Sequence, residues 1–245
     1  MVSVILRLPP EFSYLQGKYL SSRVYPEFFS LRPTERVLVA GFGDGPQALV
    51  YAGTFKKMVG VDVNSERLAR ARRLLDSLAV QNVELLHANA EQVPLPDASF
   101  DAVLAIDIIE HVEHPDQFLA EMRRLLAPGG RLLITFPAMH DKFTDAVSAI
   151  ARLLGLSKRR PPPAGWHPDY HQRDLPVAVW RAAVRRAGFR FVQSRATTMF
   201  QPLHLYGLPR FWLSNTVIHA IDRRIAALPL IKNLGQTVMA EFTRT

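Results

Sequence analysis

The strongest constraint on the fold of this chain is a regular alternation of short apolar runs and helix-patterned runs between residues 36 and 137. Almost wholly apolar runs predict strands that are buried on both faces. Helical connections between such strands predict that neighbouring strands run parallel, with helices on both faces of the sheet. The expected strands lie at 36–40, 58–63, 83–88, 100–106 and 131–136, and the expected helices begin at Pro46 and span 66–78 and 115–126.

The rest of the chain is less regular but completes the sheet. Further strands are predicted at 189–194 and 236–242, which brings the expected total to seven, and a helix over 175–187 is predicted to end at Gly188. Other expected features are a mainly helical, aromatic segment at 1–35, an amphipathic helix at 141–155, a basic proline-rich loop at 157–163 and an apolar stretch at 199–234.

The amino-acid composition excludes some classes of function and indicates the kind of partner to expect. The chain of 245 residues suits one large domain, and 48% hydrophobic residues allow a real core. It contains no cysteine, which excludes disulfides, zinc fingers and cysteine nucleophiles. The net charge of +8 favours an anionic partner, with charge spread over solvated helix faces as the alternative.

No targeting or membrane-spanning segment is expected. The apolar run at the start of the sequence breaks at Pro9 and Pro10, which argues against a signal peptide. No stretch approaches the roughly 18 uncharged apolar residues that a spanning helix needs. We therefore expect a cytoplasmic protein, with attachment to a membrane surface as the alternative.

A glycine-rich turn follows the first expected strand. Glycines at alternate positions of Gly41–Gly45 let the backbone approach a ligand closely, with its N–H groups pointing at polar or anionic atoms. The dinucleotide fingerprint fails, because its third glycine would fall on Pro46. Asp62 ends the second strand, where a carboxylate can accept both hydroxyls of a ribose. Together these features predict a nucleoside-bearing cofactor at the carboxyl ends of parallel strands.

The order of the sequence motifs resembles that of the class I S-adenosylmethionine-dependent methyltransferases. The resemblance covers about residues 35–137, and the segment AGFRFV after the late helix is also typical of this superfamily. It implies an α/β, Rossmann-like, doubly wound and mostly parallel seven-stranded sheet with helices on both faces and helical lid or cap insertions. The matching segments are, in order, VLVAGFGDG, VGVDVN, HANAEQVPLPDASFD, LAIDIIEHVEHP and LLAPGGRLLITFP.

The resemblance also implies a domain plan and a cofactor. S-adenosyl-L-methionine would be bound and released as S-adenosyl-L-homocysteine. Residues 1–245 would form a single methyltransferase domain. Its expected parts are an N-terminal helical cap at 1–35, the cofactor-binding core at 36–137, a lid insertion at 138–173, and the C-terminal helix and strands at 174–245, which include the apolar insertion 199–234.

Cofactor-binding roles follow from the same resemblance. The glycine turn would border the methionine part, Asp62 would bind the ribose hydroxyls, and Val63 would pack on the adenine face. Asn89 and the backbone N–H of Ala90 would contact the adenine edge, while Ala105 and Ile106 would line the site near the sulfonium. The implied cofactor-binding residues are Gly41, Phe42, Gly43, Gly45, Asp62, Val63, Asn89, Ala90 and Ile106.

Two positions depart from the family pattern. Val39 stands where members usually carry an acid two residues before the first glycine, so backbone carbonyls or another residue would have to bind the cofactor's ammonium. Asn89 replaces the acid that contacts adenine, and as a neutral acceptor it binds less strongly. A non-catalytic S-adenosylmethionine-binding module is therefore one alternative.

The segment Asp107–His111 supplies candidate catalytic groups beside the expected methyl position. If it is helical, Asp107 and His111 share a face, with Glu110 beside them. Two carboxylates and an imidazole can hold a divalent cation, and the pattern looks like the acid-x-x-Glu-His group of ubiquinone-pathway O-methyltransferases and small-RNA 3′-end 2′-O-methyltransferases. Without a metal, Glu110 would be structural, and His111 would line the pocket or act as a base.

A second candidate base lies in the histidine-rich stretch 166–171, where related methyltransferases often build a lid. His171 or Tyr170 can act as a general base there, and a solvated surface loop is the alternative. The candidate catalytic residues are therefore Asp107, His111 and His171.

Features outside the core bear on the acceptor. Apolar residues at helical spacing within 199–234 alternate with Arg210, Arg223 and Arg224, which suits a cap on the core or an interfacial helix facing anionic lipid headgroups. The basic loop Lys158–Arg160 is expected to lie in the lid. These features favour a small-molecule acceptor of lipophilic or anionic character.

The expected reaction is in-line methyl transfer, most naturally to oxygen. A nicotinamide oxidoreductase is disfavoured by Pro46. A nucleic-acid (RNA) methyltransferase gains from the positive charge, but no Asn/Asp-Pro-Pro-aromatic tetrad follows the fourth strand. Monomer and homodimer both stay open.

Overall fold

The computed structural model describes residues 8, 12, 25–137, 150, 153, 155, 175–197, 216–228 and 237–245. Several sequence predictions lie outside these residues. They are most of the helix expected at 141–155, the basic loop, the histidine-rich stretch 166–171 and much of the apolar stretch.

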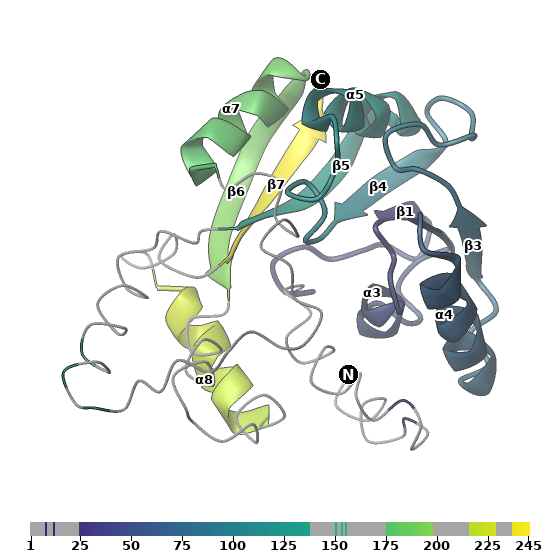
Figure 1. Ribbon diagram of the computed structural model, residues 1–245, viewed down its shortest axis with the longest axis horizontal. Coiled ribbons are helices and arrows are strands. Elements are labelled where there is room, and N and C mark those ends of the chain that lie inside the picture. The colour runs from purple at the N-terminus through teal and green to yellow at the C-terminus, as the bar shows by residue number, and fades with distance from the viewer. Residues whose placement is uncertain are drawn as a thin grey trace.

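The strands form one seven-stranded sheet in the order β3-β2-β1-β4-β5-β7-β6 (Figure 1). The pairs among the first five strands are parallel, whereas β7 lies antiparallel between β5 and β6. This confirms the predicted mostly parallel, seven-stranded α/β sheet. The strands are β1 (Arg36–Ala40), β2 (Lys57–Asp62), β3 (Val83–His87), β4 (Phe100–Ala105), β5 (Leu126–Pro137), β6 (Phe189–Thr197) and β7 (Thr237–Arg244).

The first three described helices begin at, or one residue from, the positions that the sequence predicts. Proline occupies the first turn of α3 and of α5, where its missing N–H costs nothing. The Asn64 side chain caps α4 by accepting a hydrogen bond from the Arg67 N–H at 3.0 Å. The described helices are α3 (Pro46–Val50), α4 (Ser65–Ser77), α5 (Pro115–Leu125), α7 (Val177–Arg186) and α8 (Thr216–Ala226).

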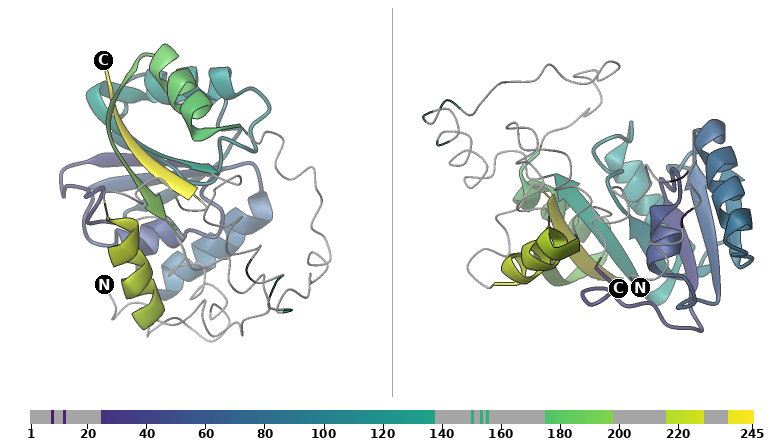
Figure 2. Two further views of the ribbon diagram at one scale, coloured as in Figure 1. Left: turned by 90° about the vertical axis from the view of Figure 1, so that its left-hand side faces the viewer. Right: turned by 90° about the horizontal axis from the view of Figure 1, so that it is seen from below.

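Alternate residues of the central strands supply two separate apolar layers. In β1, Val37 and Val39 pack in the layer that contains α3 and α4, whereas Leu38 and Ala40 pack in the layer that contains α5 and α7. The views agree that α5 and α7 lie on one side of the sheet, with α3, α4 and α8 on the other (Figures 1 and 2). The sheet is therefore doubly wound, as predicted.

The start of β5 departs from the expected boundary. The strand begins at Leu126 rather than at Arg131, and its pairing with β4 shifts register between Phe100 and Ala102. Phe100 pairs with Leu126, whereas Ala102 pairs with Arg131, so the extra residues around the glycine pair form an irregularity inside the strand. Proline and glycine therefore mark a bulge here rather than the strand's beginning.

Residues 25–35, here called the N-terminal segment, form turns and extended chain rather than the helix that the sequence predicted. Pro26 and Pro33 account for the difference, since proline restricts its own φ and disfavours a helical conformation at the residue before it. The segment packs on the C-terminal half of the molecule: Arg195 and Arg223 both lie over the ring of Tyr25, 5.0 and 4.4 Å from its centroid.

Candidate functional site

The site lies at the carboxyl ends of β1, β2 and β4, where the glycine turn leaves the sheet. Gly41, Gly43 and Gly45 all adopt positive φ, at 70°, 57° and 81°. Other L residues rarely adopt this conformation, so the repeated glycine is a backbone requirement. The N–H of Phe42 donates to the carbonyl of Val61 at 2.9 Å and fixes the turn to the end of β2.

Asp62 lies directly against this turn and is 8% exposed. Its Oδ2 accepts a hydrogen bond from the N–H of Gly43 at 2.7 Å, and its Oδ1 accepts one from the N–H of Asn64 at 2.8 Å. The carboxylate is thus held in one orientation by backbone donors on both sides. The next side chain, Val63, is 65% exposed and offers an apolar surface beside the carboxylate.

Phe42 takes part in the turn through its backbone alone. Its ring is 1% exposed and fills the space over β2, so that a Cβ added to Gly60 would lie 2.3 Å from the ring Cδ2. The phenylalanine between the first two glycines therefore belongs to the core, and only its main chain is available to a ligand.

Asp44 is a residue that the sequence reasoning missed. It is 3% exposed, and its carboxylate lies 3.1 Å from Nε of Arg70 and 3.8 Å from Nη2 of Arg67. It therefore ties the glycine turn to α4. The signal that could have found it is an acid flanked by glycines, with arginines three residues apart on the second helix after it.

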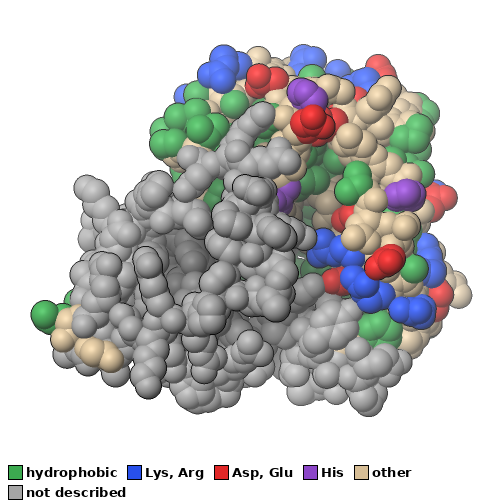
Figure 3. Space-filling view, viewed as in Figure 1, with side chains coloured by type: hydrophobic (Ala, Val, Ile, Leu, Met, Phe, Trp, Pro, Cys, Tyr) green, Lys and Arg blue, Asp and Glu red, His purple; other side chains and the backbone are tan. Residues whose placement is uncertain are grey.

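Cationic side chains gather beside the glycine turn. On the face shown in Figure 3, lysine and arginine side chains cluster over the region of α4. Arg67 and Arg70 are partly exposed there, with 42% and 39% of their side chains accessible. The arginines of this helix are Arg67, Arg70, Arg72 and Arg73.

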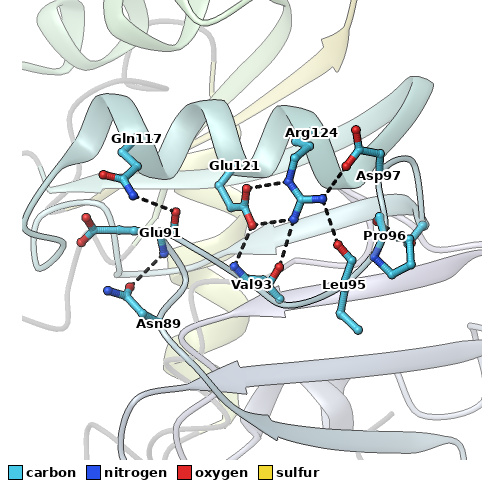
Figure 4. Close-up of polar contacts among 10 residues, drawn as sticks. Asn89, Glu91, Val93, Leu95, Pro96, Asp97, Gln117, Glu121 and Arg124 are labelled. Atoms are coloured by element: carbon cyan, nitrogen blue, oxygen red, sulfur yellow. Dashed lines mark hydrogen bonds and ion pairs between the residues drawn. The ribbon is translucent and has the colours of Figure 1, made fainter.

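Asn89 and Ala90 open the irregular segment between β3 and β4 (Figure 4). Asn89 is exposed, and its Oδ1 accepts a hydrogen bond from the N–H of Glu91 at 2.9 Å. Ala90 is 6% exposed. The side-chain oxygen predicted to contact adenine therefore also shapes the local turn.

Asp107 follows β4 and adopts an unusual conformation, with φ of 50°. The hydroxyl of Thr135 on β5 accepts a hydrogen bond from the Asp107 N–H at 2.8 Å and donates one to Asp107 Oδ1 at 3.0 Å. A non-glycine residue in this region of φ costs about 1–3 kcal/mol and persists only where its surroundings hold it. Thr135, which the sequence reasoning missed, stabilises this conformation of Asp107 through these two hydrogen bonds.

The segment after β4 is a turn, so the helical condition under which Asp107 and His111 would share a face is not met. The His111 N–H donates to the Ile108 carbonyl at 2.8 Å, and the left-handed conformation of Asp107 cannot continue a helix. The helical face predicted for Asp107 and His111 therefore does not form. Ile108 instead packs against the glycine turn, 2.9 Å from where a Cβ on Gly41 would lie.

The candidate metal ligands do not gather around one point. Within the described residues, no group of three or more His, Asp or Glu side chains has an arrangement that could hold a metal ion. Glu110 is 1% exposed, and its Oε1 lies 4.0 Å from Nε2 of the partly exposed His111. The set Asp107, Glu110 and His111 is therefore not a metal site in this structure.

The remaining predicted residues divide between the described and the undescribed parts. Ile106 is 5% exposed at the end of β4, and Ala105 is fully buried. His171 and Tyr170 lie outside the described residues. Arg223 belongs to the stretch expected to form a cap on the core or an interfacial helix, and it lies over the ring of Tyr25, with Nη1 3.9 Å from Glu27 Oε2. Among the described helices, none is both long and apolar enough to cross a bilayer.

Comparison with known proteins gives this arrangement its family. Residues 38–134 match the methyltransferase domain family. The fold, the glycine turn with its fixed carboxylate and this match over residues 38–134 make that part of the chain similar to the class I S-adenosylmethionine-dependent methyltransferases. The predicted resemblance is confirmed.

Curated relatives match part of this chain. A probable S-adenosylmethionine-dependent methyltransferase of Mycolicibacterium smegmatis is 36% identical over 153 residues, which cover 62% of this chain and 51% of the relative. A phosphatidylethanolamine N-methyltransferase of Cereibacter sphaeroides is 31% identical, covering 55% and 64%. A ubiquinone/menaquinone biosynthesis C-methyltransferase of Ectopseudomonas mendocina is 38% identical, covering 44% of each chain. This chain thus spans about half the length of the curated relatives that it matches.

Solved structures agree on the fold. A putative methyltransferase of Bacillus halodurans has a TM-score of 0.60 at 21% identity and covers 94% of this chain and 99% of its own. The cyclase SpnF also has a TM-score of 0.60, at 17% identity, covering 93% of this chain and 79% of its own. One fold thus includes a cyclase as well as methyltransferases, so the activity has to be argued from the site.

Proposed function

We propose that this protein transfers a methyl group from S-adenosyl-L-methionine to a small-molecule acceptor of lipophilic character, at oxygen. The acceptor oxygen forms a bond to the methyl carbon while the methyl–sulfur bond breaks, and the neutral thioether S-adenosyl-L-homocysteine leaves. The hydroxyl proton of the acceptor passes to a protein base. The observation that carries the proposal is the Asp62 carboxylate, fixed by backbone N–H groups at the glycine turn.

The residues present fit the cofactor. Asp62 is a nearly buried anion, already oriented to accept the two hydroxyls of a ribose. Val63 exposes 65% of its surface directly beside it, which suits the apolar face of adenine. The glycine turn would border the methionine part, with Asn89 and Ala90 at the adenine edge and Ile106 near the sulfonium. When bound, the cofactor supplies the electrophilic methyl group.

The segment after β4 would provide the catalytic groups. Asp107 is held by Thr135 at the end of β4, and His111 is 32% exposed on the following turn. Either side chain can accept the hydroxyl proton of an acceptor, and we propose His171 as a further base from the lid. A divalent cation is not required by this scheme, so chelators should leave the rate unchanged.

The relatives and one exposed surface favour a lipophilic acceptor. Two of the relatives are named for phosphatidylethanolamine and for ubiquinone or menaquinone, which are lipophilic compounds. On α8, Val217 and Ile221 are 65% and 47% exposed, as a helix facing a membrane surface requires. We propose a cytoplasmic protein with a single methyltransferase domain over 1–245 and peripheral membrane contact, as a monomer or homodimer. RNA methylation is the alternative that an acceptor screen would reveal.

Calorimetric titration with S-adenosylmethionine tests the cofactor site. Wild-type protein should bind it in the micromolar range. Asp62→Ala removes the carboxylate between two backbone donors and should weaken binding about 100-fold, since hydrogen bonds to a charged group contribute about 1.5–3 kcal/mol each. Asp76→Ala, which removes a 63% exposed carboxylate from the end of α4, is the matched control and should bind as wild type does.

Two outcomes would contradict the proposal. No binding by the wild-type protein at millimolar cofactor would exclude the cofactor. Tight binding without transfer of labelled methyl to any quinol, phenol, phospholipid or RNA acceptor would instead identify a non-catalytic binding module.

A further inference from the structure

The segment between β3 and β4 is attached in two places to α5 and to the chain just before it. Figure 4 shows the second attachment, together with a hydrogen bond from Gln117 of α5 to the carbonyl of Glu91. The first attachment, the Glu91 clamp, consists of Glu91 and the residues that its carboxylate binds. The second, the Arg124 clamp, consists of Arg124, Glu121 and the backbone around Val93. Both clamps hold the segment that begins with Asn89 and Ala90, but they connect it to different parts of the molecule.

The Glu91 clamp reaches the chain just before α5. The side chain is 6% exposed, and its Oε1 accepts a hydrogen bond from the N–H of Glu113 at 2.8 Å. Its Oε2 accepts one from the N–H of His114 at 3.1 Å and lies 3.0 Å from His114 Nδ1. His114 is the N-cap residue of α5 and makes no side-chain capping bond itself. A carboxylate 22 residues earlier in the chain therefore caps this helix.

The Glu91 contact fixes the C-terminal end of the segment that carries the candidate catalytic groups. Residues 106–114 connect β4 to α5 and include Asp107 and His111. Thr135 holds their beginning through Asp107, and Glu91 holds their end through the N–H groups of Glu113 and His114. The turn at His111 lies between these two attachment points, so its place depends on both.

Packing links the same two stretches of chain. Ala90 and Val93, on either side of Glu91, belong to the same buried cluster as Ile109 and Val112 of the segment after β4. Asn89 in turn fixes the Glu91 backbone through its side-chain oxygen. A continuous path of hydrogen bonds and packed side chains therefore runs from the expected adenine edge to the candidate catalytic turn.

The Arg124 clamp shares the packing of Val93 but differs from the Glu91 clamp in its hydrogen bonds. Arg124 donates to the carbonyls of Val93 and Leu95 at 3.0 and 2.9 Å, and Oε1 of Glu121 accepts from the Val93 N–H at 2.7 Å. Burial acts to raise the pKa of Glu121, but the hydrogen bonds from Arg124 and Val93 outweigh it and lower that pKa below its ordinary value. No hydrogen bond or ion pair described for Arg124 or Glu121 reaches residues 106–114, so this clamp holds the segment on α5 alone.

We propose that Glu91 is a positioning residue that couples cofactor binding at the adenine end to the placement of the catalytic turn. This inference rests on the proposed function. A cofactor that contacts Asn89 and Ala90 orders the backbone at Glu91, and the carboxylate transmits that order to Glu113 and His114. The reacting groups of residues 107–111 then occupy a single arrangement. Glu91 itself touches neither the cofactor nor the acceptor in this scheme.

The test compares Glu91→Gln with Glu121→Gln. Both replace a carboxylate that accepts a backbone N–H with an amide of the same shape, and both act on the same loop and helix; Glu91 is 6% exposed and the Glu121 side chain 11%. A glutamine at position 91 can keep one of the two N–H bonds, because its NH₂ group faces the other donor. Glu91→Gln should lower kcat about 10- to 100-fold, since small displacements of reacting groups cost that much, while the cofactor KM changes less than about 3-fold.

Glu121→Gln should change kcat less than about 3-fold, even if this variant's melting temperature falls as far as that of Glu91→Gln. His114→Ala keeps both backbone donors and should also stay within about 3-fold of wild type. If Glu91→Gln does not fold, Glu91→Asp, which keeps the charge on a shorter side chain, takes its place in the same comparison. Equal losses of kcat in the position-91 and position-121 variants would overturn the proposal.

Hydrogen–deuterium exchange gives a readout that needs no turnover. In the wild-type protein and in Glu121→Gln, adding S-adenosyl-L-homocysteine should slow exchange of the amides in 106–114. In Glu91→Gln this protection should be lost, although the ligand still binds. Protection that persists in Glu91→Gln would show that the coupling does not pass through Glu91. If the wild-type protein binds no cofactor in calorimetry, the proposed function fails first, and the two failures are thereby distinguished.

Discussion

Different kinds of contact stabilise two regions of the molecule. The first, here called the cofactor half, surrounds the glycine turn; the second, here called the C-terminal half, is where β5, β6 and β7 meet the N-terminal segment. At the glycine turn, the decisive hydrogen bonds join backbone N–H groups to carboxylates that are close in sequence, as between Gly43 and Asp62, 19 residues apart. In the C-terminal half, side chains join distant parts of the chain. Glu35 and Arg131 are 96 residues apart, and Gln193 binds the carbonyl of Phe28 across 165 residues.

This difference separates what each half depends on. Backbone donors are fixed by the path of the chain, so the cofactor half keeps its geometry as long as its turn forms. The C-terminal half depends on long arginine side chains that pair with acids and lie over aromatic rings, such as Arg131 over Phe29 at 4.5 Å. Substitutions in the C-terminal half should therefore lower stability without changing cofactor affinity, whereas substitutions in the cofactor half should lower both.

The largest effect on stability is expected from Arg131→Ala. Nη2 of Arg131 lies 2.8 and 2.9 Å from the two carboxylate oxygens of Glu35, whose side chain is only 7% exposed. Removing the arginine leaves that carboxylate buried without its cation, which should cost about 3 kcal/mol in the free energy of unfolding. Denaturant unfolding measures the loss, and Lys57→Ala, which breaks an exposed pair with Glu84, is the control. Cofactor affinity should not change, and a large drop in affinity would show that the two halves are coupled.

Gly60→Ala changes the cofactor half and should lower the free energy of unfolding by about 2 kcal/mol. The new Cβ would lie 2.3 Å from Cδ2 of the buried Phe42 ring, so the ring or the strand must move. Because Phe42 lies inside the glycine turn, cofactor affinity should fall together with stability. Gly53→Ala is the control, since a Cβ there meets nothing within 4 Å and only its positive φ opposes the change. Reduced stability with unchanged affinity would contradict the link between this ring and the turn.

The smallest effect is expected from Asp101→Asn, and it should depend on pH. Hydrogen bonds from the Arg36 guanidinium hold the pKa of Asp101 below its ordinary value of 3.8, although burial opposes this. A carboxyl group with a lowered pKa stabilises the folded protein above that ordinary value, and the contribution is lost as the pH falls through the lowered pKa. Because the pair is partly exposed, the variant should lose only about 0.5 kcal/mol at pH 7. The difference from wild type should vanish in acid, and a difference that persists at pH 2 would argue against the ion pair.

Most of the sheet could be predicted from the sequence, because each strand is a short apolar run bounded by turn residues. The cofactor turn was equally visible, since glycines at alternate positions after a strand indicate a backbone that needs positive φ. The beginning of β5 could not be predicted, because the bulge around Gly129 depends on how the strand pairs with β4. The same residue types fit a strand that begins at Leu126 and one that begins at Arg131.

The side chains around the site were harder to predict than the backbone. The buried orientation of Phe42 depends on the open space over Gly60, which lies on the neighbouring strand β2. The conformation of Asp107 depends on Thr135, and the role of Glu91 depends on N–H groups that lie before α5. The partners of Asp107 and Glu91 lie 28 and 22 residues away, and sequence spacing gives no rule for pairs of this kind.

The position of β7 has a consequence for the order in which the molecule can be made. Strand β6 has no neighbour among the described strands of the sheet except β7, although β7 follows it in the sequence. While the chain emerges from the ribosome, the five parallel strands can therefore assemble as soon as their residues are available, but β6 must wait. Until β7 inserts, the edge of β5 stays open, and that interval is when the nascent chain is most exposed to pairing with a neighbour.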